Sequence, residues 1–264
     1  MTSTPSAETA VSVCSDTTQR FFVTAALLFL GSAALTMSWC ASMSAMPGMD
    51  MPGGWTMSMA WMRMPGQSWA GAAATFIGMW SVMMFAMMLP AVAPALWRHR
   101  RAAHGAVLPI ALGYFGVWIL TGAGAFPIGI ALAEAEMRLP MLSGAVPLAS
   151  GVLVVIAGAL QLSPWKSRQL ACCRGPVVRG CDLRAAPRSA WRDGIRLGLR
   201  CFGCCAPMTA VLFVAGVMDL RAMALVTAAI TAERIAPHGQ RVAQVTGWAM
   251  IFAGSIYLAG AAGL

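Results

Sequence analysis

The feature that most constrains this chain is an uncharged run at residues 70–97, long enough to cross a lipid bilayer as a helix. Five methionines lie within it: Met79, Met83, Met84, Met87 and Met88. At helical spacing Met79, Met83 and Met87 lie above one another on one face, and the other two form a second row beside them. Pro90 follows, and because proline has no N–H, the Ala86 carbonyl loses its usual helical donor. The run predicts a helix carrying a double row of thioethers, the Met ladder.

Two interpretations fit the Met ladder. Thioether sulfur is a soft, polarisable ligand that suits Cu(I) and other soft ions. Methionine also fills irregular gaps between packed helices without binding anything. The Met ladder alone does not distinguish metal binding by thioethers from packing between helices, so the other parts of the sequence are needed.

Composition places the chain among polytopic membrane proteins. It is 59% hydrophobic and 10% charged over 264 residues, whereas soluble domains carry about 25% charged residues. Lipid offers no hydrogen bonds to the backbone, so the apolar runs are expected to be helices. The predicted fold class is all-α: a transmembrane helix bundle of about seven spans, or six if the first is cleaved as a signal peptide. The expected location is the bacterial inner membrane.

The expected organisation has four parts. Residues 1–19 form a disordered polar tail, 20–38 a first transmembrane helix, 39–69 a Met-rich external loop, and 70–264 the membrane domain. A cytoplasmic loop containing cysteines occupies 165–194. Inside the membrane domain the apolar runs predict spans at about 70–97, 107–133, 141–162, 195–219, 222–232 and 242–262. The run at 222–232 is short for a full crossing.

Lys and Arg set the orientation, because cytoplasmic loops are enriched in both. With the N-terminus inside, fifteen of the 18 basic residues fall on the cytoplasmic side. Only Arg63, Arg138 and Arg221 remain outside. The net charge of +9 therefore reflects topology, and no nucleic-acid partner is expected.

The Met-rich loop supports the metal interpretation. Its methionines recur at spacings of two, three and occasionally more residues: Met43, Met46, Met49, Met51, Met57, Met59, Met62 and Met64. A polar loop has no core for them to fill, and such spacings let a flexible backbone wrap a soft cation. The alternative is a segment lying on the membrane surface, anchored by Trp55, Trp61 and Trp69.

A second cluster is built from cysteine. Cys172 and Cys173 lie in the basic loop, and Cys201, Cys204, Cys205 and Met208 share one helical face. Pro207 frees the Gly203 carbonyl beside them. In the cytoplasm thiols stay reduced, so metal or redox chemistry is favoured over disulfides. Nearby arginines should favour the thiolate form: Arg174, Arg179, Arg196 and Arg200. A structural zinc site is the rival assignment.

Several motifs together resemble a known family. They are the AMMLP-type segment at 83–90, the segment at 161–166 with Cys172 and Cys173, the CxGCC-type segment at 201–208, the segment at 213–220, and Glu233-Arg234. In combination they resemble the bacterial predicted metal-binding integral membrane proteins, a domain of unknown function. The resemblance covers about residues 71–260. It implies metal binding, with copper as the expected ion.

The resulting hypothesis is a Cu(I)-handling membrane protein that takes up, stores or delivers the ion. The ligands would be the Met ladder, Cys172, Cys173, Cys201, Cys204, Cys205 and Met208. Expected partners are membrane lipid, a copper-donor or copper-acceptor protein and, as an option, further copies of the chain. No phosphate-binding loop is present and no acidic residue lies in the middle of a span, so active pumping is not expected. The protein is expected not to be an enzyme. The alternatives are a membrane thiol–disulfide oxidoreductase, a scaffold subunit of a membrane complex, and Hg(II) as the ion.

Overall fold

The computed structural model describes residues 7–44, 48–51, 54–57, 61, 66–103, 107–174 and 190–262. The described chain is almost entirely helical, which agrees with the predicted all-α class. Its helices are α1 (Ala7–Ser44), α2 (Trp69–Ala103), α3 (Val107–Arg138), α4 (Pro140–Leu162), α5 (Pro164–Arg174), α6 (Ala190–Ala215), α7 (Leu220–Ile235) and α8 (Gly239–Ala261). Strands β1 (Met49–Met51) and β2 (Trp55–Met57) form an antiparallel hairpin in which Met49 faces Met57.

Six helices in the described ranges are long and apolar enough to cross a membrane: α1, α2, α3, α4, α6 and α8. The predicted seventh span corresponds to α7, which has 16 residues. At 1.5 Å per residue α7 is about 24 Å long, which is shorter than the roughly 30 Å hydrocarbon core of a bilayer. Large apolar side chains lie exposed on the outer helices, for example Leu120, Val245 and Phe252, a surface compatible with lipid.

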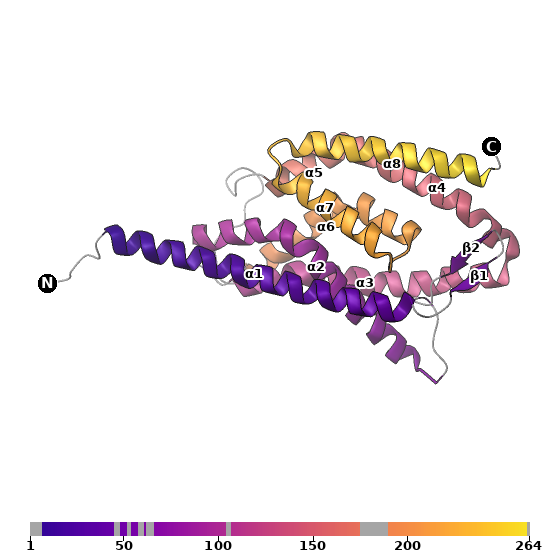
Figure 1. Ribbon diagram of the computed structural model, residues 1–264, viewed down its shortest axis with the longest axis horizontal. Helices are drawn as coiled ribbons and strands as arrows, with labels where there is room; N and C mark the ends of the chain where they lie inside the picture. Colours follow the sequence, from indigo (N-terminus) through magenta and orange to yellow (C-terminus); the bar gives the residue numbers. More distant parts are fainter. Residues whose placement is uncertain are drawn as a thin grey trace.

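The helices run roughly along the long axis of the molecule (Figure 1). α1 lies along one side and the α4–α8 pair along the opposite side, with α2, α3, α6 and α7 between them. α4 and α8 make the most extensive contact. They approach closely because glycines face the partner: a Cβ added to Gly158 would lie 2.8 Å from the Gly247 carbonyl oxygen.

The two ends of the molecule differ. α1 begins at the end where α5 lies, and α8 ends at the end that holds the β-hairpin (Figure 1). α7 brings the chain back toward the α5 end before α8 begins. Gly216, with φ of 102°, makes the turn between α6 and α7. Asp219 then caps α7 by accepting hydrogen bonds from the backbone N–H groups of Arg221 and Ala222.

α2 forms the centre of the bundle. In its most apolar window 67% of the residues are buried, compared with 6% in α1. Pro90 and Pro94 lie inside α2, which continues through both to Ala103. The Met ladder is therefore in the middle of the protein.

Three segments differ from the sequence-based expectations. α1 begins at Ala7, so residues 7–19 are helical, whereas a disordered tail was expected. The Met-rich loop contains the β-hairpin. The loop expected at 165–194 contains α5 and the start of α6, while residues 175–189 lie outside the described ranges.

Close contact between α3 and α6 brings two site residues together. A Cβ added to Gly194 would overlap the Ile110 carbonyl, and one added to Gly113 would collide with the Trp191 carbonyl. Only glycine permits this approach. As a result Tyr114, next to Gly113, reaches Cys201 on α6.

Candidate metal site

All five side chains of the Met ladder are buried, with exposed fractions of 0 to 6%. Met84 and Met88 are completely enclosed at 0%. The ladder belongs to the same buried core as the cysteines of α6. The structure therefore brings together the two clusters that the sequence placed far apart.

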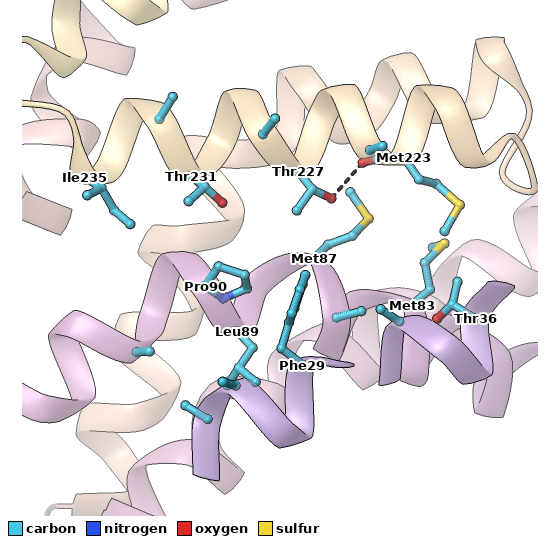
Figure 2. A pocket seen from close by; sticks show the side chains of 18 of the residues that line it. Phe29, Thr36, Met83, Met87, Leu89, Pro90, Met223, Thr227, Thr231 and Ile235 are labelled. Atoms are coloured by element: carbon cyan, nitrogen blue, oxygen red, sulfur yellow. Dashed lines mark hydrogen bonds between the residues drawn. The ribbon is translucent and has the colours of Figure 1, made fainter. Parts of the chain in front are cut away.

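The row formed by Met83 and Met87 faces a cavity of about 1020 Å³ between α1, α2 and α7 (Figure 2). The wall is mostly apolar and includes Phe29 and Pro90. Met223 of α7 enters the same cavity, and its sulfur points toward that of Met83. Met223 is thus a third thioether in this cavity, and the sequence analysis did not single it out.

The row formed by Met84 and Met88 leads to α6. The Sδ atom of Met88 lies 4.0 Å from the Sγ atom of Cys201. The Tyr114 hydroxyl makes a 2.9 Å hydrogen bond with the same Cys201 sulfur. Thioether and thiol donors are therefore adjacent at this point.

Four of the predicted cysteines form a thiol cluster, consisting of Cys173, Cys201, Cys204 and Cys205. Cys201 and Cys205 lie one helical turn apart, with their sulfurs 3.9 Å from each other. Cys173 of α5 forms a side-chain hydrogen bond with Cys204. All four side chains are buried. Cys172 is exposed, unlike these four, and its role as a ligand stays a prediction. Met208 is buried on α6 close to the cluster in sequence.

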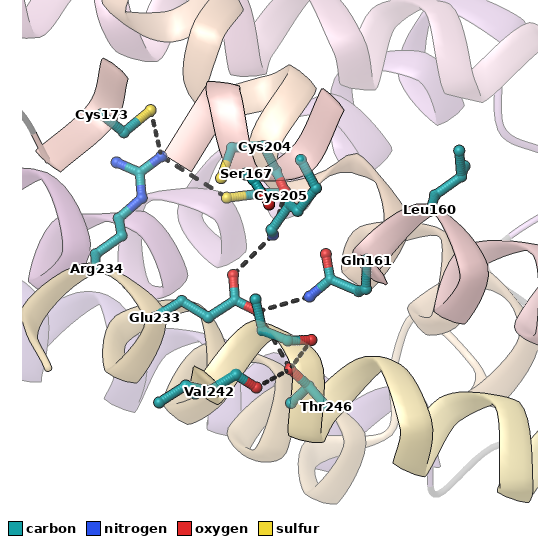
Figure 3. A network of polar contacts seen from close by, with 12 residues as sticks. Leu160, Gln161, Ser167, Cys173, Cys204, Cys205, Glu233, Arg234, Val242 and Thr246 are labelled. Carbon is teal, nitrogen blue, oxygen red and sulfur yellow. Dashed lines mark hydrogen bonds and ion pairs between the residues drawn. The ribbon is translucent and has the colours of Figure 1, made fainter. Parts of the chain in front are cut away.

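Arg234 of α7 faces the thiol cluster (Figure 3). Its Nη2 atom lies 3.6 Å from the Cys173 sulfur and 3.9 Å from the Cys205 sulfur. Its Nε atom is buried and has no hydrogen-bond partner among the described residues. The side chain therefore brings a positive charge to one member of each thiol pair.

A polar network supports the cluster from below (Figure 3). Lys166 donates a 2.6 Å hydrogen bond to the Cys204 carbonyl and pairs with Glu233 at 2.7 Å. Both side chains of this ion pair are at most 2% exposed. Gln161 and Thr246 donate hydrogen bonds to the same carboxylate, at 2.6 and 3.2 Å. Because Lys166 and Glu233 neutralise each other, the network fixes α4, α5, α6, α7 and α8 against one another.

Arg174, one of the four arginines expected to favour thiolates, binds backbone carbonyls, and Arg179 lies outside the described residues. Arg174 donates hydrogen bonds to the carbonyls of Glu233, Ala236 and Pro237, where α7 ends. The hydrogen bond with Cys204, together with burial, raises the pKa of the Cys173 thiol above its ordinary value. Cys173 is thus favoured in the protonated form, contrary to expectation.

The Met-rich loop is also partly a packed structure. Met51 and Met57 are buried with Ala133 in a small core beneath the hairpin. Trp55 of β2 donates a hydrogen bond to the Ser143 carbonyl at 3.1 Å, which holds the hairpin to α4. The expectation that these methionines have no core to fill is therefore wrong for these two. Met46, Met59, Met62 and Met64, like Cys181, lie outside the described residues.

One further sulfur pair lies near the end of α1. The Cys40 thiol donates to the Met218 sulfur at 3.9 Å, across the turn between α6 and α7. Cys40 is 2% exposed, so it is far less accessible than its position near the end of a span suggests.

The number of ligands in the thiol cluster limits which metal ions it can hold. No group of three or more His, Cys, Asp or Glu side chains is arranged to hold a metal ion in the ranges that the structure describes. A closed tetrahedral zinc site needs four such ligands. The thiol pairs that are present, with a thioether alongside, are soft donors of the kind that suit a soft, sulfur-preferring metal ion.

The comparison with protein families agrees with this chemistry. Residues 77–257 match the family model described as PpoB2 copper chaperone. The chain belongs to this family. The match covers the Met ladder, the thiol cluster and the polar network, whereas α1 and the hairpin lie outside it. No curated protein and no solved structure matches the chain.

Sequence reasoning missed several residues that the structure places in or beside the site: Tyr114, Gln161, Lys166, Met223, Glu233 and Arg234. Four of them lie within motifs that carried the family resemblance, which gave no role to any of them. A buried Lys in a short basic helix looks like a topology determinant until its carboxylate partner is known. Tyr114 carries no sequence signal, since its role depends on the close approach of α3 and α6.

Proposed function

We propose that this protein is a membrane copper chaperone whose cargo is Cu(I), received by thioethers and held by thiols before delivery to a partner protein. The observation that carries the proposal is the 4.0 Å contact between the Met88 and Cys201 sulfurs. It joins the Met ladder to the thiol cluster within one buried core.

The order of the ligands supports a direction. A neutral thioether binds Cu(I) more weakly than a thiolate does, so affinity should rise from the Met ladder to the cysteines. The distribution of basic residues supports a cytoplasmic position for the α5 end, where the thiol cluster lies. Movement from the hairpin end toward the cluster is then downhill and needs no energy source.

Softness of the donors supports the choice of ion. Sulfur atoms line the proposed route, and the Cys201 sulfur contacts the Met88 sulfur, the Cys205 sulfur and the Tyr114 hydroxyl. Such a site discriminates against hard ions such as Mg²⁺ and Ca²⁺. Hg(II) is also soft and remains the competing ion.

The alternative of a thiol–disulfide oxidoreductase fits the geometry poorly. An exchange enzyme needs an attacking thiol that a substrate disulfide can reach. Here Cys201, Cys204 and Cys205 are at most 1% exposed. We therefore assign binding and transfer of a metal ion, without catalysis of a covalent reaction.

The test is Cu(I) binding to the full chain, purified in detergent under reducing conditions and titrated against a chromogenic Cu(I) chelator. The proposal predicts tight binding that is lost when Cys201, Cys204 and Cys205 are all replaced by Ser, because hydroxyl oxygen is a hard donor. A triple variant that folds and keeps the wild-type affinity would show that the thiol cluster is structural. Binding of Hg(II) but not Cu(I) by the wild type would change the assigned ion.

A further inference from the structure

The charges around the thiol cluster do not cancel. Lys166 and Glu233 form a close ion pair at 2.7 Å, so their charges neutralise each other. Arg234 has no carboxylate within ion-pair distance among the described residues. Its neighbours are instead the Cys173 and Cys205 sulfurs. One positive charge is therefore left at the cluster when the thiols are protonated.

Binding of a metal ion changes this balance in a way that depends on the charge of the ion. A monovalent ion that displaces two thiol protons gives a bis-thiolate complex of charge −1, and two H⁺ leave. The guanidinium of Arg234 then brings the total to zero. A divalent ion that displaces the same two protons gives a neutral complex, and the charge of Arg234 remains uncompensated. Leaving a charge without a partner in a buried site is costly.

We infer that Arg234 makes the thiol cluster selective for a monovalent soft cation over a divalent one. This inference rests on the proposed function, and it assigns the selection to a residue that need not touch the ion. The geometry fits this role, because Nη2 reaches one member of each thiol pair. The buried Nε atom of Arg234 has no hydrogen-bond partner among the described residues. This fits a guanidinium whose opposite charge is supplied by the thiolates once the metal ion is bound.

Softness and charge can be separated experimentally. Ag(I) and Hg(II) are both soft and bind thiolates, but they differ in charge. We would measure the affinity of each ion for the purified full-length protein by competition with a thiol chelator. The proteins are the wild type, Arg234→Met, Arg234→Lys, and Arg221→Met as a matched control. Arg221 lies at the opposite end of α7 and is exposed.

Arg234→Met should lower the ratio of Ag(I) to Hg(II) affinity by about tenfold or more, as expected from the loss of a charge about 4 Å from the ligands. Arg234→Lys keeps the charge and should retain most of the wild-type ratio, as should Arg221→Met. If Arg234→Met does not fold, Arg234→Gln serves in its place, and folding is checked by gel filtration.

An unchanged ratio in the folded Met or Gln variant would overturn the inference. That failure is distinct from failure of the proposed function. If the Cys201, Cys204 and Cys205 triple Ser variant loses Ag(I) while the Arg234 variants keep the wild-type ratio, only the selectivity role is wrong. If the triple variant binds Ag(I) as the wild type does, the thiol cluster is not the site and both proposals fall.

Discussion

The Met88 sulfur lies 4.0 Å from the Cys201 sulfur, although 113 residues separate the two in the chain. This contact joins α2 to α6 at the point where thioethers give way to thiols. Tyr114 approaches the same sulfur from α3. Three helices of the core therefore meet at Cys201, which makes it the junction of the proposed route.

Replacing Met88 by Leu should break this junction without disturbing the fold. The two side chains are similar in volume, so the packing cost should stay below about 1.5 kcal/mol. We expect normal abundance and a loss of copper delivery, measured as copper accumulation in cells or as transfer to an acceptor. Met141→Leu is the matched control, because Met141 is 92% exposed. Normal copper handling in the Met88 variant would mean that Met88 is a packing residue only.

The row of the Met ladder formed by Met83 and Met87 can be tested in a similar way. Met83→Leu combined with Met87→Leu removes two thioethers from the cavity wall and nearly conserves apolar volume. Insertion and stability should be unchanged while copper handling declines. A double variant that is abundant and handles copper normally would assign this row to packing.

The buried Lys166–Glu233 pair should be important for stability. Lys166→Met leaves a buried carboxylate without its cation, which typically costs 3–5 kcal/mol. Thermal unfolding in detergent should show a large loss for either single variant and a smaller loss for Lys166→Met combined with Glu233→Leu. Replacing Arg138, whose pairing with Glu134 is exposed, should cost less than about 1 kcal/mol. Equal losses for the buried and exposed pairs would contradict the role assigned to the network.

The contact between α3 and α6 can be tested with alanine. Gly194→Ala places a methyl group against the Ile110 carbonyl, and overpacking of this kind costs about 1–3 kcal/mol. It should also separate Tyr114 from Cys201 and weaken Cu(I) binding. Gly124→Ala, on the same helix as Tyr114, meets nothing within 4 Å and should be neutral. If Gly194→Ala were as harmless as Gly124→Ala, close approach would not be what positions Cys201.

Labelling with a membrane-impermeant thiol reagent tests the orientation. Cys172 is exposed, and the charge asymmetry assigns it to the cytoplasm. In a variant with Cys14 and Cys181 replaced by Ser, Cys172 should react in opened membranes but stay unlabelled in intact cells. Labelling in intact cells would reverse both the orientation and the direction of the proposed route.

The membrane-spanning helices and their approximate bounds were predictable because each carries an apolar run of nearly span length, whereas α5 carries none and was expected to be loop. The run at 107–133 corresponds to α3 and the run at 141–162 to α4. Helix ends depend on local capping, such as the Asp219 cap of α7, and these were predicted less well. The residues 7–19 look polar enough for a tail, yet they extend α1.

The donor types at the site were predictable, but their partners were not. Spacing alone placed Cys201, Cys204 and Cys205 on one face of a helix, and the structure adds that they are buried. The Arg234 contact depends on how α7 packs against α6, which no local pattern encodes. Met51 was expected to bind metal in a polar loop, but the structure buries it beneath the hairpin.

X-ray absorption spectroscopy of the full-length protein loaded with one equivalent of Cu(I) would identify the atoms that bind the ion. We expect a copper shell made only of sulfur, because the route and the cluster offer sulfur donors. In the Cys201, Cys204 and Cys205 triple Ser variant the thiolate contribution should fall to that of Cys173 at most, leaving weakly held copper bound mainly by thioethers. A wild-type shell dominated by nitrogen or oxygen, or an identical spectrum for the triple variant, would contradict this expectation.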